Sequence, residues 1–141
     1  MKLPQFNSLI KEGFNHIPLS REVVVDTATP LALYLKLANN SYSYFLESVQ
    51  GGEKWGRYSF IGLAAETVIK VNDYEVRVEK KGELIQELEV EDPLVWIDEY
   101  QNQFKVPQLD NLPDFNGGLV GYFGYEIVRY IEPKLAHINK T

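Results

Sequence analysis

The sequence YSYFLESVQGGEKWGRYSFIG, residues 42–62, determines how the rest of the chain is expected to fold. Its first eight residues are rich in β-forming side chains, and both faces of the resulting strand are largely apolar, so they predict a strand buried on both faces. Gly51 and Gly52 then interrupt the strand, and residues 57–61 begin a second one. We expect the two strands to pair as an antiparallel hairpin.

Polar side chains stand at the end of this hairpin where the strands approach the loop. Glu47 and Ser48 close an otherwise apolar segment, and a buried carboxylate or hydroxyl without a partner costs roughly 2 kcal/mol or more. The returning strand is expected to bring Arg57 back to the same end. Together with nearby aromatic rings, these three groups suit a flat, apolar, zwitterionic ligand. The alternative is a surface ion pair, worth about 0 to 1 kcal/mol, with Ser48 capping a turn.

Composition limits the classes of function. The chain has 141 residues, of which 45% are hydrophobic, and this is enough for one domain, with one core or with one core and a long appendage. A net charge of −6 argues against nucleic acid and anionic membranes as partners. The sequence contains no cysteine, so a disulfide framework or thiolate site is excluded, in keeping with a cytoplasmic protein. It contains neither a signal peptide nor an apolar run near the ~20 residues that span a bilayer.

Three helices are expected from their start signals. Pro4 suits the first turn of a helix over residues 4–12, which Gly13 would end. Thr29 followed by Pro30 predicts a second helix through residue 38, and Asp92 followed by Pro93 predicts a third through residue 104.

Strands are expected between and after these helices. Residues 67–71, 74–79 and 83–90 predict an antiparallel meander, with turns at residues 72–73 and 80–82 and with Tyr74, Val76 and Val78 on its inner face. From Gly117 onward, a glycine-punctuated apolar strand precedes a helical turn. This order predicts an α+β fold, mostly an antiparallel sheet or sandwich with a few flanking helices.

Catalytic chemistry is not indicated by the residues themselves. The glycines at 117, 118, 121 and 124 lack the following Gly-Lys-Ser/Thr of a phosphate loop, and glycines in a strand usually allow close packing. His16 and His137 have no suitably spaced acidic or histidine partner for a metal or catalytic site. The segment therefore has the character of a binding or scaffolding domain.

Two motifs together carry a family resemblance. The run FLESVQGGEKWGRYSFIG at residues 45–62, followed by GGLVGYFGYEIVRYIEP at residues 117–133, resembles the amino-terminal region of anthranilate synthase component I. The resemblance extends over nearly the whole chain. It implies an enzyme that, with a glutamine amidotransferase subunit (component II), converts chorismate and glutamine to anthranilate, pyruvate and glutamate in tryptophan biosynthesis, using Mg²⁺.

The resemblance also implies the role of this segment. Residues 1–141 would form the amino-terminal regulatory domain, without catalytic or metal-binding residues, and the chorismate- and metal-binding domain would begin after residue 141. The family's Leu-Glu-Ser motif in the tryptophan feedback site matches Leu46, Glu47 and Ser48. Glu47 would serve the ammonium of L-tryptophan, and Ser48 or Arg57 its carboxylate.

Alternatives remain open from the sequence. The chain also resembles aminodeoxychorismate synthase component I, which shares the scaffold of anthranilate synthase and can hold tryptophan as a structural ligand. A freestanding amino-acid sensor would need no catalytic residues. A purely structural domain that docks the amidotransferase subunit would leave ligand binding unchanged when Ser48 is replaced by alanine.

Overall fold

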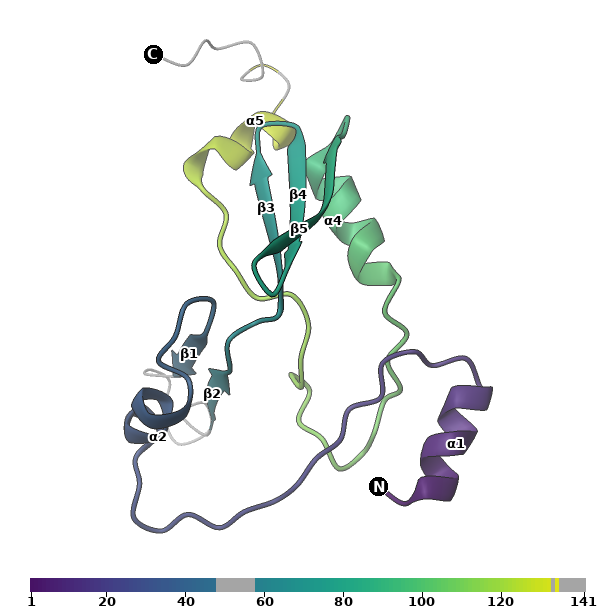
Figure 1. Cartoon of the computed structure of the whole chain (residues 1–141), viewed down its shortest axis with the longest axis vertical. Helices are drawn as coiled ribbons and strands as arrows, with labels where there is room; N and C mark the ends of the chain where they lie inside the picture. The colour runs from purple at the N-terminus through teal and green to yellow at the C-terminus, as the bar shows by residue number, and fades with distance from the viewer. Residues whose placement is uncertain (48–57, 133, 135–141) are drawn as a thin grey trace. The chain divides into compact units, whose positions relative to one another are not determined.

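The computed structural model describes residues 1–47, 58–132 and 134, and it has an α+β architecture (Figure 1). The chain divides into two compact units, one made of residues 1–22 and 90–141 and the other of residues 23–89. The described strands form two antiparallel sheets, one with two strands and one with three. The expected α+β class, with antiparallel sheets and flanking helices, is confirmed.

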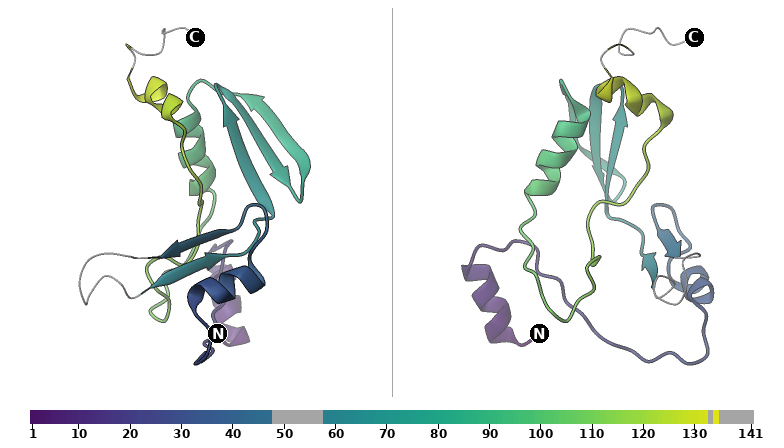
Figure 2. Two further views of the ribbon diagram at one scale, coloured as in Figure 1. Left: turned by 90° about the vertical axis from the view of Figure 1, so that its left-hand side faces the viewer. Right: turned by 180° about the vertical axis from the view of Figure 1, so that it is seen from behind.

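The central hairpin lies in the unit of residues 23–89. Strand β1 (Tyr44–Glu47) pairs antiparallel with β2 (Ser59–Gly62), and Tyr44 lies opposite Gly62 while Glu47 lies opposite Ser59. Helix α2 (Pro30–Leu37) lies against this pair (Figure 2). The predicted hairpin is therefore confirmed, and the loop that joins its strands lies outside the described residues.

Helix α2 begins where the sequence predicts. The Thr29 hydroxyl accepts a hydrogen bond from the backbone N–H of Ala32 at 3.2 Å, and Pro30 fills the first helical turn. A side-chain cap of this kind satisfies one of the N–H groups that a helix leaves unpaired at its start. This fixed start places Tyr34 beside the hairpin.

The expectation that the first hairpin strand is buried on both faces is wrong. Phe45 is half-buried because its ring stacks on that of Tyr34, with the ring centroids 5.6 Å apart. Leu46 points to the opposite face of the strand, and its side chain is 47% exposed. Because successive side chains of a strand point to opposite faces, α2 covers the face of β1 that carries Phe45, and the face that carries Leu46 is left open.

A three-stranded meander completes this unit. Strands β3 (Thr67–Asn72), β4 (Glu75–Lys80) and β5 (Glu83–Glu89) are hydrogen-bonded in that order. Val76 and Val78 on β4 are 0% and 1% exposed, as the predicted inner face requires. The meander is therefore confirmed, with its buried valines on the central strand.

The first turn of the meander differs from the prediction by one residue. Asn72 pairs with Glu75, so the turn consists of Asp73 and Tyr74, and Asp73 takes a φ of 52°. Aspartate tolerates this left-handed conformation better than most residues. Tyr74 consequently leaves the inner face of β4 and is 41% exposed.

The second turn follows the predicted chemistry. Lys81 and Gly82 have φ values of 53° and 84°, the combination that a two-residue type I′ hairpin needs. The pairing of β4 with β5 then shifts register between Val78 and Glu79, so that Ile85 has no partner in the ladder. This is a β-bulge, which increases the local twist of the sheet edge.

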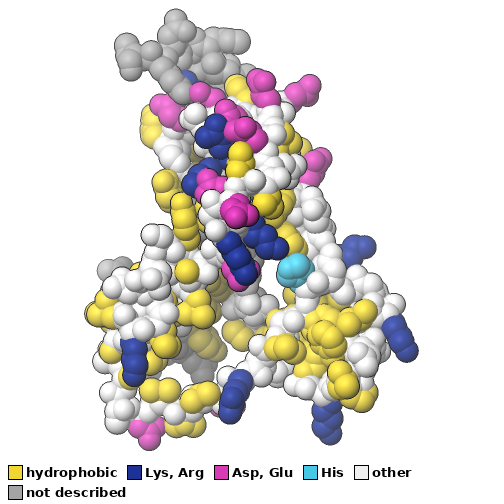
Figure 3. Space-filling view, viewed as in Figure 1, with side chains coloured by type: hydrophobic (Ala, Val, Ile, Leu, Met, Phe, Trp, Pro, Cys, Tyr) yellow, Lys and Arg dark blue, Asp and Glu magenta, His cyan; other side chains and the backbone are white. Residues whose placement is uncertain are grey.

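Charged side chains interleave over the meander (Figure 3). Arg77 contacts Glu75 and, across the strands, Glu87, and Lys70 forms an ion pair with Glu79. The hydrogen bond that the Arg77 guanidinium donates to the Glu87 carboxylate is the main cause that raises the pKa of Arg77 above its ordinary value. All of these groups lie on the solvent-exposed face of the sheet, as expected for an antiparallel sheet that packs only one face against the core.

The unit of residues 1–22 and 90–141 contains the other helices that the structure describes. Helix α1 (Leu3–Lys11) ends in a Schellman motif, in which Gly13 has a φ of 91° and Phe14 N–H donates to Leu9 O at 3.2 Å. Helix α4 (Pro93–Asn102) begins at Asp92, whose Oδ1 accepts from the N–H groups of Leu94 and Val95. Both starts and the glycine stop agree with the sequence prediction.

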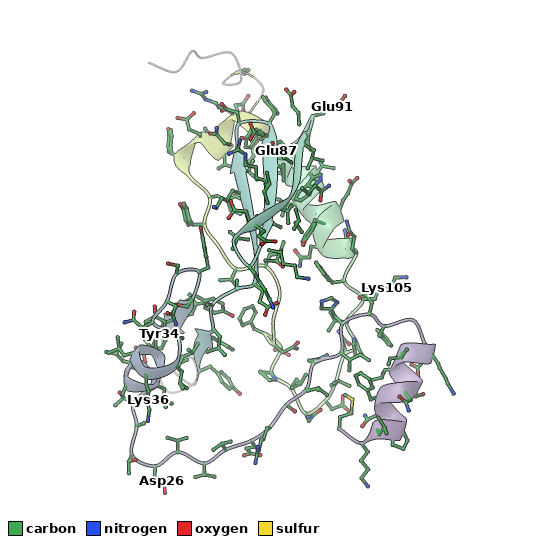
Figure 4. All side chains as sticks on the ribbon, viewed as in Figure 1. Asp26, Tyr34, Lys36, Glu87, Glu91 and Lys105 are labelled. Carbon is green, nitrogen blue, oxygen red and sulfur yellow. The ribbon has the colours of Figure 1, made fainter. Side chains whose placement is uncertain are left out.

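An aromatic column runs along α4 and reaches the segment after α1. Trp96 stacks on Tyr100, and Phe104 meets Tyr100 and His16 edge to face, with centroid separations of 5.2, 5.4 and 4.6 Å. The carbonyl of Lys105, labelled in Figure 4, accepts the N–H groups of both Asn15 and His16. These contacts join two parts of the unit that are almost ninety residues apart in sequence.

The strand predicted from Gly117 onward is not present. Residues 117–124 have no regular secondary structure, and Gly117 and Gly118 take φ values of 148° and 134°. A 3₁₀ turn, η1 (Tyr125–Ile127), and helix α5 (Val128–Ile131) follow, so the predicted helical turn is confirmed. A strand needs a neighbouring strand for its backbone, and no described segment pairs with this one.

Candidate functional site

The candidate site lies at the end of the hairpin that carries Glu47 and Ser59. These two residues are direct partners across the strands, and the Ser59 hydroxyl donates to Glu47 Oε1 at 3.3 Å. Both side chains belong to the same face of the hairpin as Phe45. The Glu47 side chain is exposed, so the expectation of a buried carboxylate is wrong, and its oxygens keep free acceptor capacity for a cation from solvent.

Both faces of the hairpin carry stacked aromatic rings. On the Glu47 face, Phe45 stacks on Tyr34, which Figure 4 labels on α2 beside the hairpin. On the other face, Tyr58 and Phe60 stack with centroids 6.2 Å apart. The hairpin therefore combines an exposed anionic group with stacked aromatic surface, a combination that suits an organic cation with a flat apolar body.

Leu46 and Glu47 lie on opposite faces of the hairpin. Leu46 lies opposite Phe60, and successive side chains of a strand point in opposite directions. The structure thus brings Glu47 together with Ser59, and it brings Leu46 together with Phe60. The other two predicted site residues, Ser48 and Arg57, lie outside the described residues.

A close contact fixes the base of the hairpin. The ring of Tyr44 lies directly over Gly62, so closely that a Cβ at residue 62 would overlap the ring atoms. An aromatic side chain that covers a cross-strand glycine buries apolar surface that the glycine cannot supply, and it holds the two strands in register. This contact positions the site end, three residues further along β1.

A second contact connects the hairpin to the meander. Tyr42 has a φ of 59°, which is unusual for a tyrosine, and its carbonyl accepts the N–H of Ala65 at 3.0 Å. Lys70 Nζ lies 5.7 Å from the centre of the Tyr42 ring, and Glu79 accepts from the same ammonium at 2.7 and 2.8 Å. Hydrogen bonding to Glu79, and secondarily to Tyr42, raises the pKa of Lys70 above its ordinary value.

Sequence reasoning missed Tyr42, Ser59 and Lys70. Ser59 was detectable only through the hairpin register, because the length of the glycine-containing loop sets which residue faces Glu47. The contact between Tyr42 and Lys70 has no sequence signal, since the two residues are 28 positions apart, Tyr42 in the turn before β1 and Lys70 on β3.

Among the residues that the structure describes, no group of three or more His, Cys, Asp or Glu side chains is arranged to hold a metal ion. None of the helices in the described ranges has the length and apolar character needed to cross a membrane.

Comparison with known proteins shows a clear sequence relationship. The chain is 51% identical to anthranilate synthase component 1 of Pseudomonas aeruginosa over 136 residues, which is 96% of this chain and 28% of the relative. It is 48% identical to the protein of the same name from Neisseria gonorrhoeae over 137 residues, covering 97% of this chain and 28% of the relative. The resemblance found in the motifs is confirmed over nearly the whole chain.

A more distant relative agrees with these two. Anthranilate synthase component 1 of Aquifex aeolicus is 41% identical over 125 residues, or 88% of this chain and 25% of the relative. The chain thus spans 25% to 28% of the length of these three curated relatives. No family model matches the chain, and no solved structure matches it.

Proposed function

We propose that this chain is the amino-terminal, regulatory part of an anthranilate synthase component I. The whole protein, a cytoplasmic lyase, converts chorismate and glutamine to anthranilate, pyruvate and glutamate together with a glutamine amidotransferase subunit, component II. The observation that carries the proposal is 51% identity over 96% of the chain to a relative of that name. The FLES motif at residues 45–48 and the IVRYIEP sequence at residues 127–133 favour this assignment over aminodeoxychorismate synthase.

The proposal assigns no catalytic residue to this chain. Chorismate and Mg²⁺ would bind to residues outside these 141, where the ion would polarise a carboxylate of the substrate. The contribution of the present residues is regulatory and structural. They bind the end product and hold the hairpin that carries its site.

The feedback ligand would be L-tryptophan at the open end of the hairpin. In the proposal, Glu47 accepts from the ammonium and Ser48 or Arg57 binds the carboxylate, while Leu46 lies on the opposite face of the hairpin from Glu47 and is left out of this set. The support from the described residues is the exposed Glu47 carboxylate, which accepts a hydrogen bond from Ser59 at one oxygen and shares its strand face with Phe45, whose ring stacks on Tyr34. An exposed carboxylate with a free oxygen is suited to a charge-assisted hydrogen bond from an ammonium group.

Inhibition at such a site requires two conformations. L-Tryptophan must bind one of them more tightly, because a ligand with equal affinity for both shifts no equilibrium. The hairpin is a suitable element for this purpose, since its two short strands pair only with each other in the described residues.

The experiment that tests the function uses a chimaeric protein. This chain replaces the matched residues of the Pseudomonas aeruginosa relative, and anthranilate formation from chorismate is followed by fluorescence with glutamine and component II, and separately with ammonia. We expect activity with both nitrogen sources and inhibition by L-tryptophan. The assignment would be overturned if the full-length natural protein that contains this chain, in place of the chimaera, formed aminodeoxychorismate and not anthranilate.

A further inference from the structure

Residues 119–125 form an apolar segment that the described part of the chain leaves uncovered. Tyr122, Tyr125 and Phe123 are 95%, 89% and 65% exposed, and Leu119 and Val120 are each more than 40% exposed. Isolated apolar residues are common on protein surfaces, but a contiguous run of this kind indicates an interaction site. Residues 115–125 also carry no charge.

The backbone of the same segment is equally unpartnered. No residue from 117 to 123 forms a backbone hydrogen bond with another described residue, and Figure 1 draws this stretch without a strand arrow. Backbone N–H and C=O groups next to apolar side chains need partners once water is removed. A partner must therefore supply hydrogen bonds as well as apolar contacts.

The residue pattern identifies the kind of partner. In an extended conformation, Leu119 and Phe123 lie on one face and Val120 and Tyr122 on the other, so both faces are apolar. Strands of this type are covered on both sides, and glycines within them allow another backbone to approach closely. Exposed edge strands, in contrast, are protected by charges or prolines, which this segment lacks.

We propose that residues 119–125 add as a strand to a sheet formed by the polypeptide that the relatives carry outside the matched region. Nearly three quarters of the length of the P. aeruginosa relative lies outside the match. A second copy of this chain would supply one more strand but no cover for either face, and an isolated two-stranded ribbon is marginal in water. The inference rests on the proposed function, because it requires the longer polypeptide of that family.

The test compares backbone hydrogen exchange in the 141-residue chain and in the full chimaera with the P. aeruginosa relative. We expect the amides of residues 119–123 to exchange fast in the chain alone and at least about 100-fold more slowly in the chimaera. Fast exchange in the chimaera overturns the proposal. Slow exchange in a dilute solution of the 141-residue chain would mean that its own residues cover the segment. Slow exchange of that chain only at high concentration would mean that a second copy covers it. Either result overturns the proposal.

Two matched variants sharpen the result. Val120→Asp places a charge in the proposed strand, and Val24→Asp makes the same change at an exposed valine in the other unit. In the chimaera, we expect Val120→Asp to abolish most of the protection and to lower the thermal midpoint, while Val24→Asp leaves both unchanged. Equal effects of the two variants contradict the proposal.

A minimal graft keeps the test decisive if the full chimaera does not fold. Residues 117–126 alone then replace the aligned residues of the relative, and the same amides are followed. Enzyme activity separates this inference from the proposed function. A protected segment in a chimaera that forms no anthranilate supports the strand and overturns the proposed function. An unprotected segment in an active chimaera supports the proposed function and overturns the strand.

Discussion

Tyr44 and Gly62 face each other across the hairpin, and the tyrosine ring occupies the space that any side chain at residue 62 would need. The contact lies three residues before Glu47, on the strand that carries the candidate site. It therefore connects the packing of the hairpin directly to the position of the carboxylate.

Gly62→Ala is expected to destabilise the hairpin. The new methyl group overlaps the Tyr44 ring, and overpacking of this kind costs about 1–3 kcal/mol. Urea unfolding followed by tyrosine fluorescence measures the effect. Gly124→Ala is the matched control, because a Cβ there meets nothing within 4 Å and the φ of −70° suits alanine. A loss of the same size in both variants would count against the contact.

Asp92→Ala is expected to lower the free energy of unfolding by about 1 kcal/mol. The substitution removes the carboxylate oxygen that accepts the N–H groups of Leu94 and Val95 at 2.8 and 3.3 Å. Asp92→Asn keeps an acceptor in the same place and should retain most of the stability. The measurement is the midpoint of urea unfolding for the native chain, Asp92→Ala and Asp92→Asn. Equal stability of the two variants would exclude a capping role for Asp92.

The contact of Lys70 with Glu79 and Tyr42 is expected to depend on pH at the alkaline end. Because the folded-state pKa of Lys70 is raised above its ordinary value of 10.5, the stabilisation is complete below pH 10.5 and is lost as the pH rises through the folded-state pKa. The difference in urea midpoint between the native chain and Lys70→Met should therefore be constant from pH 7 to pH 9 and shrink above 10.5. A difference that instead grows with pH would reverse the sign of the linkage.

Ser59→Ala is expected to weaken the binding of L-tryptophan roughly 2–10-fold, the range of one hydrogen bond to a carboxylate. The Ser59 hydroxyl holds Glu47 Oε1, and its loss frees the carboxylate to leave the binding position. Ser59→Thr keeps the hydroxyl and should restore the affinity. Equal affinities of the alanine and threonine variants would show that Ser59 has no positioning role.

The sequence predicts those parts of the fold that local chemistry controls. The helix starts at Thr29 and Asp92, the glycine stop after α1 and the type I′ turn at Lys81 and Gly82 all follow from side chains within four residues of the feature. Strand pairing in the hairpin and the meander was likewise predictable, because the turns that join the meander strands are short and the apolar residues alternate.

The failures occur where the environment of a residue depends on distant parts of the polypeptide. The segment after Gly117 has the composition of a buried strand, but no described segment pairs with it. The prediction for Leu46 failed for the same reason, because its apolar neighbours predicted burial but its face of the hairpin is exposed. Composition indicates that a residue is suited to burial, and only the complete set of neighbours determines whether it is buried.

The most direct test of the account is a calorimetric titration of the chimaeric protein with L-tryptophan, with D-tryptophan and L-phenylalanine as controls. Glu47→Gln and Ser48→Ala are titrated in parallel, and Lys36→Gln, a change on the adjacent helix, serves as the control variant. We expect stereoselective binding that both site variants weaken at least about 10-fold and that the control variant leaves unchanged. Unchanged binding in both site variants, or no binding by a catalytically active chimaera, would contradict it.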